Sequence, residues 1–374
     1  MPLTTSSGSW GPGSSSPRPP SRDIERRGAV ISSDSRHRQA GQPTKLKFNI
    51  PEWVISGETT DVYFRRAKEI LDKEGLRPLS TIEFFASRSG LLCGIREAIQ
   101  LIEQAVPSHD REVFALEEGD AIEEKEVVLR IHGPYSAYGL YETPLLGILS
   151  HCTGWATAAR ECVEAAGEIP VISFGARHVH PMVSGRMEYA AILGGCQGCA
   201  SIDGAGMWGL PPSGTIPHAL ILAMGDTVTA AEAFDRHMPP EVPRYVLVDT
   251  FKDEAEESLR VARALGDRLE GVRLDTPIER GRVTADLVKE VRARLDLEGF
   301  QRIKIVVSGG LDPARIRYFR EKGAPVDSFG VGGYIANARP INFTADIHEV
   351  EGRPMAKRGR IPGITHNPRL KRVL

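Results

Sequence analysis

The sequence predicts an α/β protein: a parallel sheet, either a barrel or doubly wound, beside a smaller α+β layer. Three observations lead to this prediction. From residue 151 to about 335, short apolar segments alternate with amphipathic helical segments. Between residues 46 and 150, strand and helix patterns are mixed without strict alternation. Residues 1–45 have almost no apolar periodicity, which indicates a segment outside the folded part.

Composition argues against several classes of protein. A formal net charge of −2 over 374 residues leaves no basic excess, so a nucleic-acid partner is not expected. No apolar run approaches the roughly 18 residues that span a bilayer, so no membrane partner is expected either. Five cysteines are few and odd in number, which fits a reducing compartment rather than a secreted disulfide scaffold. We therefore expect a cytoplasmic protein.

Residues 1–45 are rich in Ser, Pro, Gly and Arg. Such a composition cannot bury enough apolar surface to offset the entropy of ordering, so a disordered tail is predicted. A transit peptide would also be rich in Arg and Ser. The acidic residues and the many prolines argue against that alternative.

Between residues 46 and 150 the pattern predicts two helices and several strands. Thr60 or Asp61 would cap a helix that runs to about Lys73 and ends at Gly75. A second helix is expected over residues 96–106. The expected strands are residues 81–87, 113–116 and 127–132.

Five buried parallel strands are expected next, because five segments are short, apolar and rich in β-branched residues. They are residues 169–174, 245–249, 272–274, 303–307 and 328–331. Apolar residues recur every three or four positions in the intervening helices. These helices are residues 254–265, 284–295 and 313–321. A hairpin of residues 343–350 and 353–359 would add strands to the smaller domain. The predicted division is a tail (1–45), an α+β domain (46–150, completed by 340–374) and an α/β domain (151–339).

Reactive groups in parallel α/β folds gather at the carboxyl ends of the strands. Here the strands lead into a cationic segment, two carboxylates and two glycine-rich turns. The residues concerned are Phe174, Arg177, His178 and His180, then Asp249, Asp275, Ser308, Gly309 and Gly310, and finally Gly330, Gly332 and Gly333. Backbone N–H groups of glycine turns that precede helices can bind phosphate. We expect the pair of turns to bind phosphate; the alternative is that they are only tight connections.

Asp249 and Asp275 each end a strand. Carboxylates there can accept hydrogen bonds from ribose hydroxyls, hold Mg²⁺ through water or stabilise a developing oxocarbenium ion. Arg273 lies on the same face of its strand as Asp275. A structural salt bridge between the two is the competing interpretation.

Three further patterns are interpreted as carrying no function. Gly204, Gly206 and Gly209 match the spacing of a dinucleotide-binding fingerprint, but no apolar strand precedes them. Cys196 and Cys199 have the spacing of zinc ligands without a second pair, so packed cysteines are expected. The basic residues 369–372 are expected to form a solvated tail.

Seven segments, taken in order, resemble the nicotinate phosphoribosyltransferase family, in the branch typical of archaea and some bacteria. The resemblance covers about residues 46–360, and the set of motifs is far more specific than any single one. The segments are 59–64 (TTDVYF), 173–181 (SFGARHVHP), 214–218 (GTIPH), 248–250 (VDT), 272–275 (VRLD), 307–310 (VSGG) and 329–333 (FGVGG).

The resemblance implies an incomplete α/β barrel with an N-terminal open sandwich. It also implies a homodimer, or a higher oligomer of dimers, with active sites shared between subunits. Asp61 and Tyr63 would then reach the neighbouring subunit's site. Tyr63 and Phe174 would enclose a pyridine ring, with Arg177 at its carboxylate; plain core packing is the alternative for both aromatic residues. Arg88 is a looser match to a residue that reaches the diphosphate.

The implied reaction joins nicotinate to phosphoribosyl diphosphate, giving nicotinate mononucleotide and diphosphate in NAD biosynthesis. Mg²⁺ would accompany the diphosphate, and Asp275, with Asp249, would stabilise the cationic transition state. No residue is assigned as a direct metal ligand. In the family, the histidine of a Gly-Thr-x-x-His segment is phosphorylated by ATP, and His218 matches it. A buried hydrogen-bonded histidine is the alternative.

Rival functions remain open on the same scaffold. Nicotinamide enzymes place an Asp near the amide, where this chain has Cys199-Ala-Ser201, although Asp203 lies close by. Quinolinate enzymes use a different Arg-rich signature. A catalytically idle homologue that binds phosphoribosyl ligands is a third possibility. An NAD-dependent dehydrogenase is disfavoured because its fingerprint lacks the necessary strand.

Overall fold

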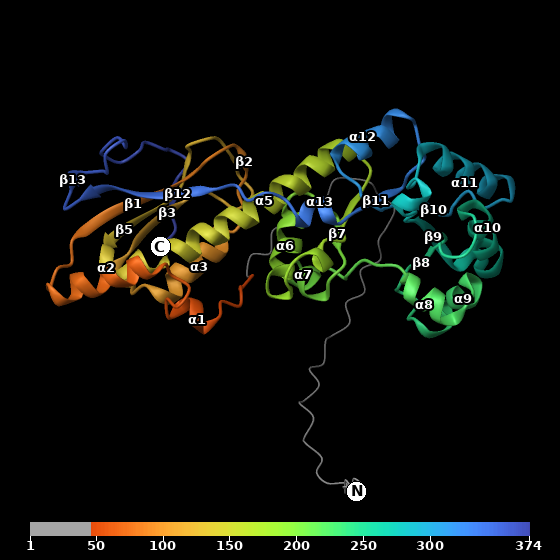
Figure 1. Cartoon of the computed structure of the whole chain (residues 1–374), viewed down its shortest axis with the longest axis horizontal. Helices are drawn as coiled ribbons and strands as arrows, with labels where there is room; N and C mark the ends of the chain where they lie inside the picture. The colour runs from red at the N-terminus through yellow and green to blue at the C-terminus, as the bar shows by residue number, and fades with distance from the viewer. Residues whose placement is uncertain (1–45) are drawn as a thin grey trace, which may run out of the picture. The chain divides into compact units, whose positions relative to one another are not determined.

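The computed structural model describes residues 46–374, so the expected disordered tail of residues 1–45 lies outside the described part of the chain. Two six-stranded sheets, one antiparallel and one parallel, organise these residues (Figure 1). The parallel sheet curls into a half-barrel, and the antiparallel sheet forms a separate domain. This confirms the predicted incomplete α/β barrel with an N-terminal α+β sandwich. Among the described helices, none combines the length and apolar character needed to cross a membrane.

The antiparallel sheet combines strands from both ends of the described chain, in the order β13-β12-β1-β5-β3-β14. Its strands are β1 (Leu79–Ala86), β3 (Glu112–Ala115), β5 (Val127–Pro134), β12 (Phe343–Val350), β13 (Arg353–Pro354) and β14 (Lys371–Arg372). A small separate pair joins β2 (Gly90–Leu91) to β4 (Ala121–Ile122). The predicted hairpin is present, although its second strand covers residues 353–354 rather than 353–359; β12 and β13 turn at Glu351 and Gly352, both with positive φ, as a tight hairpin requires.

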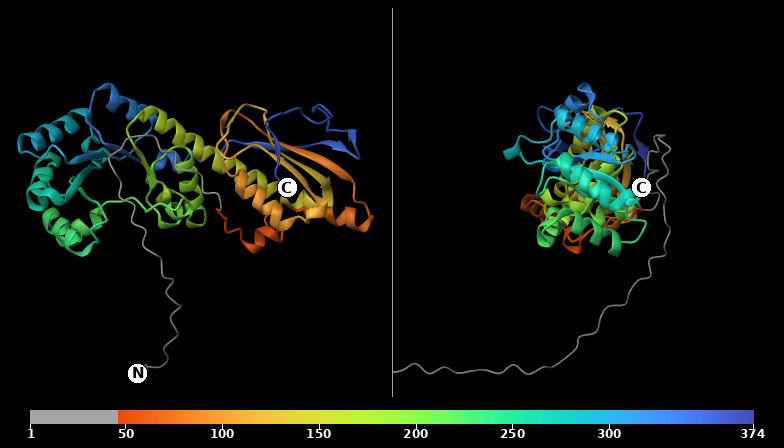
Figure 2. Two further views of the ribbon diagram at one scale, coloured as in Figure 1. Left: turned by 180° about the vertical axis from the view of Figure 1, so that it is seen from behind. Right: turned by 90° about the vertical axis from the view of Figure 1, so that its right-hand side faces the viewer.

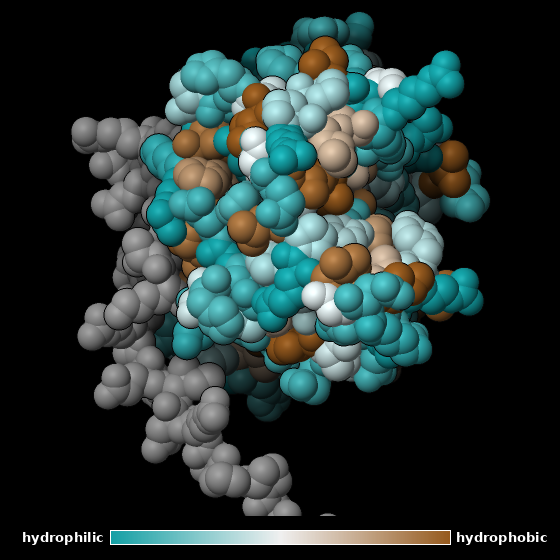
Figure 3. All heavy atoms as spheres, turned by 90° about the vertical axis from the view of Figure 1, so that its left-hand side faces the viewer, coloured by the Kyte–Doolittle hydropathy of each residue, from teal (hydrophilic) through white to brown (hydrophobic). Residues whose placement is uncertain are grey.

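Helices of the sandwich domain differ in how much they bury. They are α1 (Glu52–Ile55), α2 (Val62–Lys73), α3 (Ile95–Ala105) and α4 (Tyr135–Tyr138). Helix α3 buries Ile95, Ala98 and Leu101, whose spacing of three residues sets them on one face. Helix α2 has the predicted bounds but buries no residue, and its Val62 and Ile70 are exposed. Figure 3, which faces this domain, shows apolar residues scattered among polar ones.

One long helix, α5 (Glu142–Ala166), runs between the two domains (Figures 1 and 2). It contacts α3 and β12 in the sandwich domain and α6 and α12 in the α/β domain. The predicted boundary at residues 150 and 151 therefore falls inside a continuous helix. Pro144 lies in its first turn, where a proline leaves the helix intact. Small buried residues such as Ala156 and Ala159 allow elements of both domains to pack against it.

The parallel sheet has the order β7-β6-β11-β10-β9-β8. Its strands are β6 (Val171–Ser173), β7 (Gly198–Cys199), β8 (Arg244–Leu247), β9 (Leu269–Leu274), β10 (Lys304–Val307) and β11 (Ser328–Val331). All five predicted strands are present. The sixth, β7, was not predicted, because two residues after a glycine-containing loop provide no apolar run. It pairs in register with β6, Ile172 opposite Gly198.

Helices cover this sheet in the predicted alternation. They are α6 (Pro181–Leu193), α7 (Ile202–Met207), α8 (His218–Met224), α9 (Thr227–His237), α10 (Glu254–Leu265), α11 (Ala285–Leu297), α12 (Pro313–Glu321) and α13 (Gly333–Ala336). Aspartate side chains cap several of them: Asp253 accepts from the N–H of Ala255, and Asp312 from that of Arg315.

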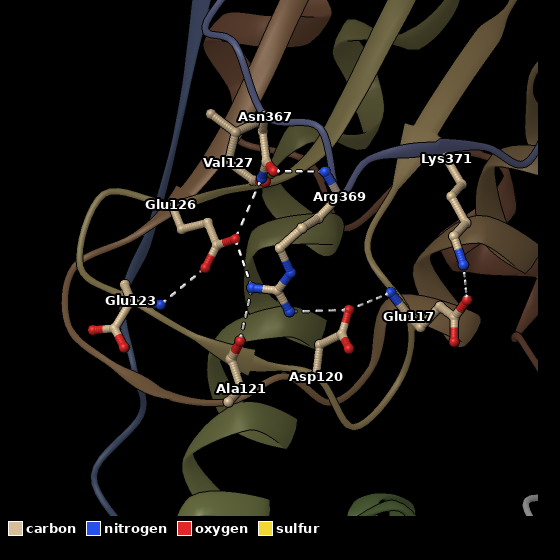
Figure 4. Close-up of polar contacts among 9 residues, drawn as sticks. All are labelled: Glu117, Asp120, Ala121, Glu123, Glu126, Val127, Asn367, Arg369 and Lys371. Carbon is tan, nitrogen blue, oxygen red and sulfur yellow. Dashed lines mark hydrogen bonds and ion pairs between the residues drawn. The ribbon is translucent and has the colours of Figure 1, made fainter.

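The basic residues of 369–372 are exposed, as expected, but the segment is not a tail. Strand β14 pairs with β3, with Lys371 opposite Ala115. Arg369 lies 3.3 Å from Asp120 and 2.8 Å from Glu126, and it donates to the carbonyl of Ala121 (Figure 4). The acidic partners are about 250 residues away along the chain, so local sequence could not reveal them.

Candidate active site

The parallel sheet brings most of the predicted residues to one edge, because the carboxyl ends of its strands all lie on the same side. Contacts between residues from different strand ends demonstrate this convergence: the Arg273 guanidinium lies over the Phe174 ring, and Ser308 bonds to both Arg273 and Asp275. We name this group the strand-end cluster. It comprises Phe174, His218, Asp249, Arg273, Asp275 and Ser308, with the glycine turns at 309–310 and 332–333.

Arg273 joins the parts of the cluster. Its Nε donates to Ser308 Oγ at 2.8 Å, and its guanidinium lies 3.4 Å from Asp275 Oδ1. A further N–H points to Thr215 Oγ1 at 3.3 Å. The guanidinium carbon lies 4.6 Å from the centroid of the Phe174 ring, within the range of a cation–π contact. Burial lowers the pKa of Arg273, but an arginine starts so high that it remains cationic.

The first glycine turn adjoins Asp275. Ser308 Oγ donates to Asp275 Oδ1 at 2.6 Å, which ties the end of β10 to the end of β9. Gly309 follows with φ of 91°, and a Cβ there would lie 3.3 Å from the same carboxylate oxygen. The left-handed backbone conformation therefore favours glycine, and a side chain here would also crowd the carboxylate.

The second glycine turn makes room for the aromatic side chain. A Cβ on Gly330 would collide with the Phe174 ring. A Cβ on Gly332 would lie 3.0 Å from the Phe174 carbonyl oxygen and 3.2 Å from His178 Nε2. Gly333 begins α13. The end of β11 thus holds Phe174 and His178 at the same edge as the first turn.

His218 and Asp249 form a pair that the sequence did not predict. Asp249 Oδ1 lies 3.1 Å from His218 Nε2, and the Asp249 side chain is only 3% exposed. The hydrogen bond from Asp249 raises the pKa of His218; Asp275 adds to this effect and Arg273 opposes it. With Nε2 donating to Asp249, Nδ1 of His218 is the ring nitrogen with a free lone pair.

Asp61 and Tyr63 lie outside the strand-end cluster. Asp61 precedes α2 and accepts hydrogen bonds from Thr143 at 3.1 Å and from Tyr63 at 3.2 Å. Burial raises the pKa of Tyr63, and the neighbouring Asp61 carboxylate raises it further. Within residues 46–374, no hydrogen bond or ion pair links either residue to the cluster.

Three other predicted residues have different surroundings. Arg177 is exposed and near enough to Arg273 for its charge to lower the pKa of that guanidinium. His180 caps α6, with Nδ1 accepting from the Met182 N–H at 3.2 Å. Arg88 donates only to the Arg339 carbonyl, at 3.4 Å, among the contacts of the described chain. Arg177 is therefore near the cluster, whereas Arg88 is not in contact with it.

Sequence reasoning missed two neighbours of the cluster. Thr215 lies in the segment that contains His218, but its contact with Arg273 depends on tertiary packing. Arg282 donates to the Gly310 carbonyl at 3.2 Å from a loop that follows Asp275. In the sequence this arginine was indistinguishable from any other charged loop residue.

The two motif matches set aside as chance remain unsupported. Strand β7 does precede Gly204, contrary to our premise, but Gly204 and Gly206 lie within α7 rather than in a phosphate-binding turn. Cys196 and Cys199 are buried. No three His, Cys, Asp or Glu side chains are grouped as a metal site in residues 46–374.

Comparisons with known proteins show which family this chain resembles in sequence and fold. The family model for the N-terminal domain of quinolinate phosphoribosyl transferase matches residues 61–153, and that for the C-terminal domain matches residues 155–346. A nicotinate phosphoribosyltransferase from Bacillus subtilis is 31% identical over 60% of this chain and 46% of its own length. One from Mycobacterium tuberculosis is 32% identical over 67% and 54%. The chain thus spans about half the length of these curated relatives.

Solved structures extend the likeness. The crystal structure of nicotinate-nucleotide pyrophosphorylase from Pyrococcus furiosus is 42% identical, with a TM-score of 0.78 over 86% of this chain and 82% of that one. Human nicotinic acid phosphoribosyltransferase, 20% identical, shares the fold with a TM-score of 0.65 over 82% and 77%. Both domain models match in order, and a relative matches over most of its length. The chain therefore belongs to the quinolinate phosphoribosyl transferase family.

Proposed function

We propose that this chain is a nicotinate phosphoribosyltransferase that joins nicotinate to phosphoribosyl diphosphate, releasing diphosphate, within NAD biosynthesis. The observation that carries the proposal is the junction of Arg273, Ser308 and Asp275 between the Phe174 ring and a glycine turn. This junction brings together the aromatic face of Phe174, the Asp275 carboxylate and the glycine turn at 309–310. We include in this proposal the branch typical of archaea and some bacteria; the 42% identity with the Pyrococcus furiosus protein supports the family.

The ring would bind against Phe174, with its carboxylate at Arg177. Aromatic faces and an arginine suit a planar anion. Arg273 is already engaged by Asp275 and Ser308, whereas Arg177, near the cluster, forms no ion pair within residues 46–374. One unpaired guanidinium on the Phe174 side of the cluster favours a ring with one carboxylate over quinolinate, which has two.

A second subunit would complete the ring site. Tyr63 has no contact with the strand-end cluster of its own chain within residues 46–374, and it is 56% exposed. Val62 and Ile70 on the same helix are exposed as well. These observations support a homodimer in which α2 of one subunit presents Asp61 and Tyr63 to the other.

The transfer would proceed at the ribose C1 carbon. The pyridine nitrogen donates its lone pair to C1, while the C1–O bond to diphosphate breaks and its electrons leave with the diphosphate oxygen. Asp275 would stabilise the positive charge that develops on the ribose. Holding the ring against Phe174 supplies the alignment that makes attack effectively intramolecular.

Mg²⁺ fits the cluster. The second carboxylate oxygen of Asp275, whose side chain is 25% exposed, has no hydrogen-bond partner among the described residues, so it is available to a hydrated cation. Magnesium binds through one or two carboxylates, water and substrate phosphates. When bound, it would neutralise charge on the leaving diphosphate.

ATP coupling would use His218. Nδ1 would attack the terminal phosphorus of ATP; the N–P bond forms as the P–O bond to ADP breaks. Asp249 orients the ring and keeps the proton on Nε2 throughout. Hydrolysis of the phosphohistidine would then drive synthesis forward.

In the test, purified protein is incubated with nicotinate, nicotinamide or quinolinate. Each mixture also contains phosphoribosyl diphosphate and Mg²⁺, and each is run with and without ATP. We expect nicotinate mononucleotide to form, and to form faster with ATP. Preference for nicotinamide or quinolinate would change the ring assignment. Consumption of no ring would support an idle ligand-binding homologue and overturn the proposal.

A further inference from the structure

The loop between β9 and α11, residues 275–284, positions the guanidinium of Arg282 beside the first glycine turn. Its base is fixed by Thr276, which is 3% exposed and donates to Glu254 Oε1 at 2.7 Å. Beyond it the loop doubles back, with the N–H of Arg282 donating to the Pro277 carbonyl at 3.1 Å. This bond returns Arg282 toward the sheet edge that the loop has just left.

Arg282 adopts an unusual backbone conformation and contacts the turn directly. Its φ of 65° makes it one of three non-glycine residues with positive φ among residues 46–374. Such a conformation is disfavoured for a long side chain and persists where the surroundings fix it. The guanidinium donates to the Gly310 carbonyl at 3.2 Å. It also packs so closely that a Cβ on Gly310 would collide with it.

The charge of Arg282 has no protein partner in the described chain. No Asp or Glu of residues 46–374 lies within ion-pair distance of it, and only one hydrogen bond uses its five donors. Its loop neighbour Arg280 differs, because it lies 3.9 Å from Glu254. A guanidinium held against a glycine turn, with donors to spare, is suited to a phosphate.

We propose that Arg282 binds the 5′-phosphate of the phosphoribosyl group. Asp275 contacts Gly309, and Arg282 contacts Gly310, so consecutive residues of one turn adjoin a carboxylate and a cation. A ribose 5-phosphate lying along this turn sets its hydroxyl-bearing sugar beside Asp275 and its phosphate beside Arg282. The assignment rests on the proposed function, which supplies the phosphoribosyl ligand.

The test compares two ligands that differ only in the 5′-phosphate. Binding of nicotinate mononucleotide and of nicotinate riboside is measured by calorimetry for the wild type and for Arg282→Ala. We expect the variant to bind the mononucleotide about 10- to 100-fold more weakly, the range for hydrogen bonds to a charged group. Binding of the riboside should be unchanged. Equal weakening of both ligands, or none for the mononucleotide, would overturn the proposal.

Three further variants and one further probe separate the alternatives. Arg280→Ala removes a charge from the same loop and should change neither affinity. Arg282→Gln can still donate to Gly310, so full retention of mononucleotide affinity would mean that Arg282 only shapes the loop. Arg282→Lys should recover part of the affinity. If Arg282→Ala weakens binding of Mg²⁺-diphosphate and not of the mononucleotide, the cation serves the leaving group instead.

Failure of the proposed function gives a different result. If the wild type binds no nicotinate nucleotide, ribose 5-phosphate becomes the probe. Thermal stabilisation of the wild type by ribose 5-phosphate, lost in Arg282→Ala and kept in Arg280→Ala, would support the phosphate site without the nicotinate chemistry. No difference between these proteins would reject it.

Discussion

At the scale of single residues, the His218–Asp249 pair changes the role expected for one aspartate. From its position at a strand end, Asp249 is expected to bind ribose hydroxyls, to hold magnesium through water or to stabilise the cationic transition state. Its nearly buried side chain instead bonds to His218 Nε2. Asp249 can therefore orient the histidine ring. Asp275, bound to Ser308 and Arg273, remains the carboxylate expected beside C1.

The raised pKa of His218 predicts a pH dependence for the ATP-coupled step. Only the neutral ring has a lone pair on Nδ1, so ATP hydrolysis should rise as the pH increases through this raised pKa. Asp249→Asn removes the charge that holds the pKa up. The rising limb of the pH profile should then move to lower pH, with a lower maximum. Rate–pH profiles and NMR titration of the His218 ring check this.

A matched variant tests the role of the ring itself. His218→Asn should lose ATP stimulation at every pH while retaining basal synthesis. An unshifted limb in Asp249→Asn, or a shifted limb without any change in the His218 titration, would contradict the assignment.

At the scale of elements, the site depends on strand ends cross-linked by side chains. Ser308 at the end of β10 bonds to Arg273 within β9 and to Asp275 just after it. Because Ser308 is 2% exposed, water cannot replace these bonds easily. Ser173, at the end of β6, is also fully buried, but its hydroxyl has no hydrogen-bond partner among the described residues.

These two serines form a matched pair for a stability measurement. Ser308→Ala leaves Arg273 Nε and Asp275 Oδ1 each short of a partner, so it should lower the free energy of unfolding by about 1–3 kcal/mol. Ser173→Ala removes a hydroxyl that makes no bond and should be neutral or slightly stabilising. Denaturant unfolding of the free protein checks both. Equal losses would mean that the cross-links between strand ends contribute little.

At the scale of the whole described chain, the C-terminal segment completes the sheet that the N-terminal part began. Residues 343–374 supply β12, β13 and β14 of the antiparallel sheet. Arg130 of β5 joins this arrangement by pairing with Glu83, which is fully buried. The Thr365 N–H also donates to Glu83, at 3.1 Å. The sandwich domain therefore closes only when both ends of the described chain are in position.

Replacing one basic residue near the C-terminus should show this closure. Arg369→Ala removes two ion pairs and a bond to the Ala121 carbonyl, and should lower the free energy of unfolding by about 1–2 kcal/mol. Lys371→Ala is the control, because its ion pair with Glu117 is exposed and should contribute nothing measurable. Thermal unfolding compares them. A larger loss for Lys371→Ala would contradict the structural role of Arg369.

The sequence by itself determined the elements with strong local patterns. Helices α10 and α12 have the predicted bounds, and five parallel strands lie where apolar β-branched segments were found. Caps, apolar periodicity and glycine turns act over a few residues, so they are visible in the sequence. The gathering of functional side chains at one edge of the sheet followed from the common direction of parallel strands.

Only the tertiary structure decided the rest. Strand β7 is formed by pairing with β6, α5 continues across the expected domain boundary, and Arg369 meets carboxylates about 250 residues away along the chain. The pairing of Asp249 with His218 and the approach of Arg282 to Gly310 likewise depend on which strands become neighbours. Hydrogen bonds and ion pairs act over a few ångströms in space, whatever the separation in sequence, so their partners exist only once the chain has folded.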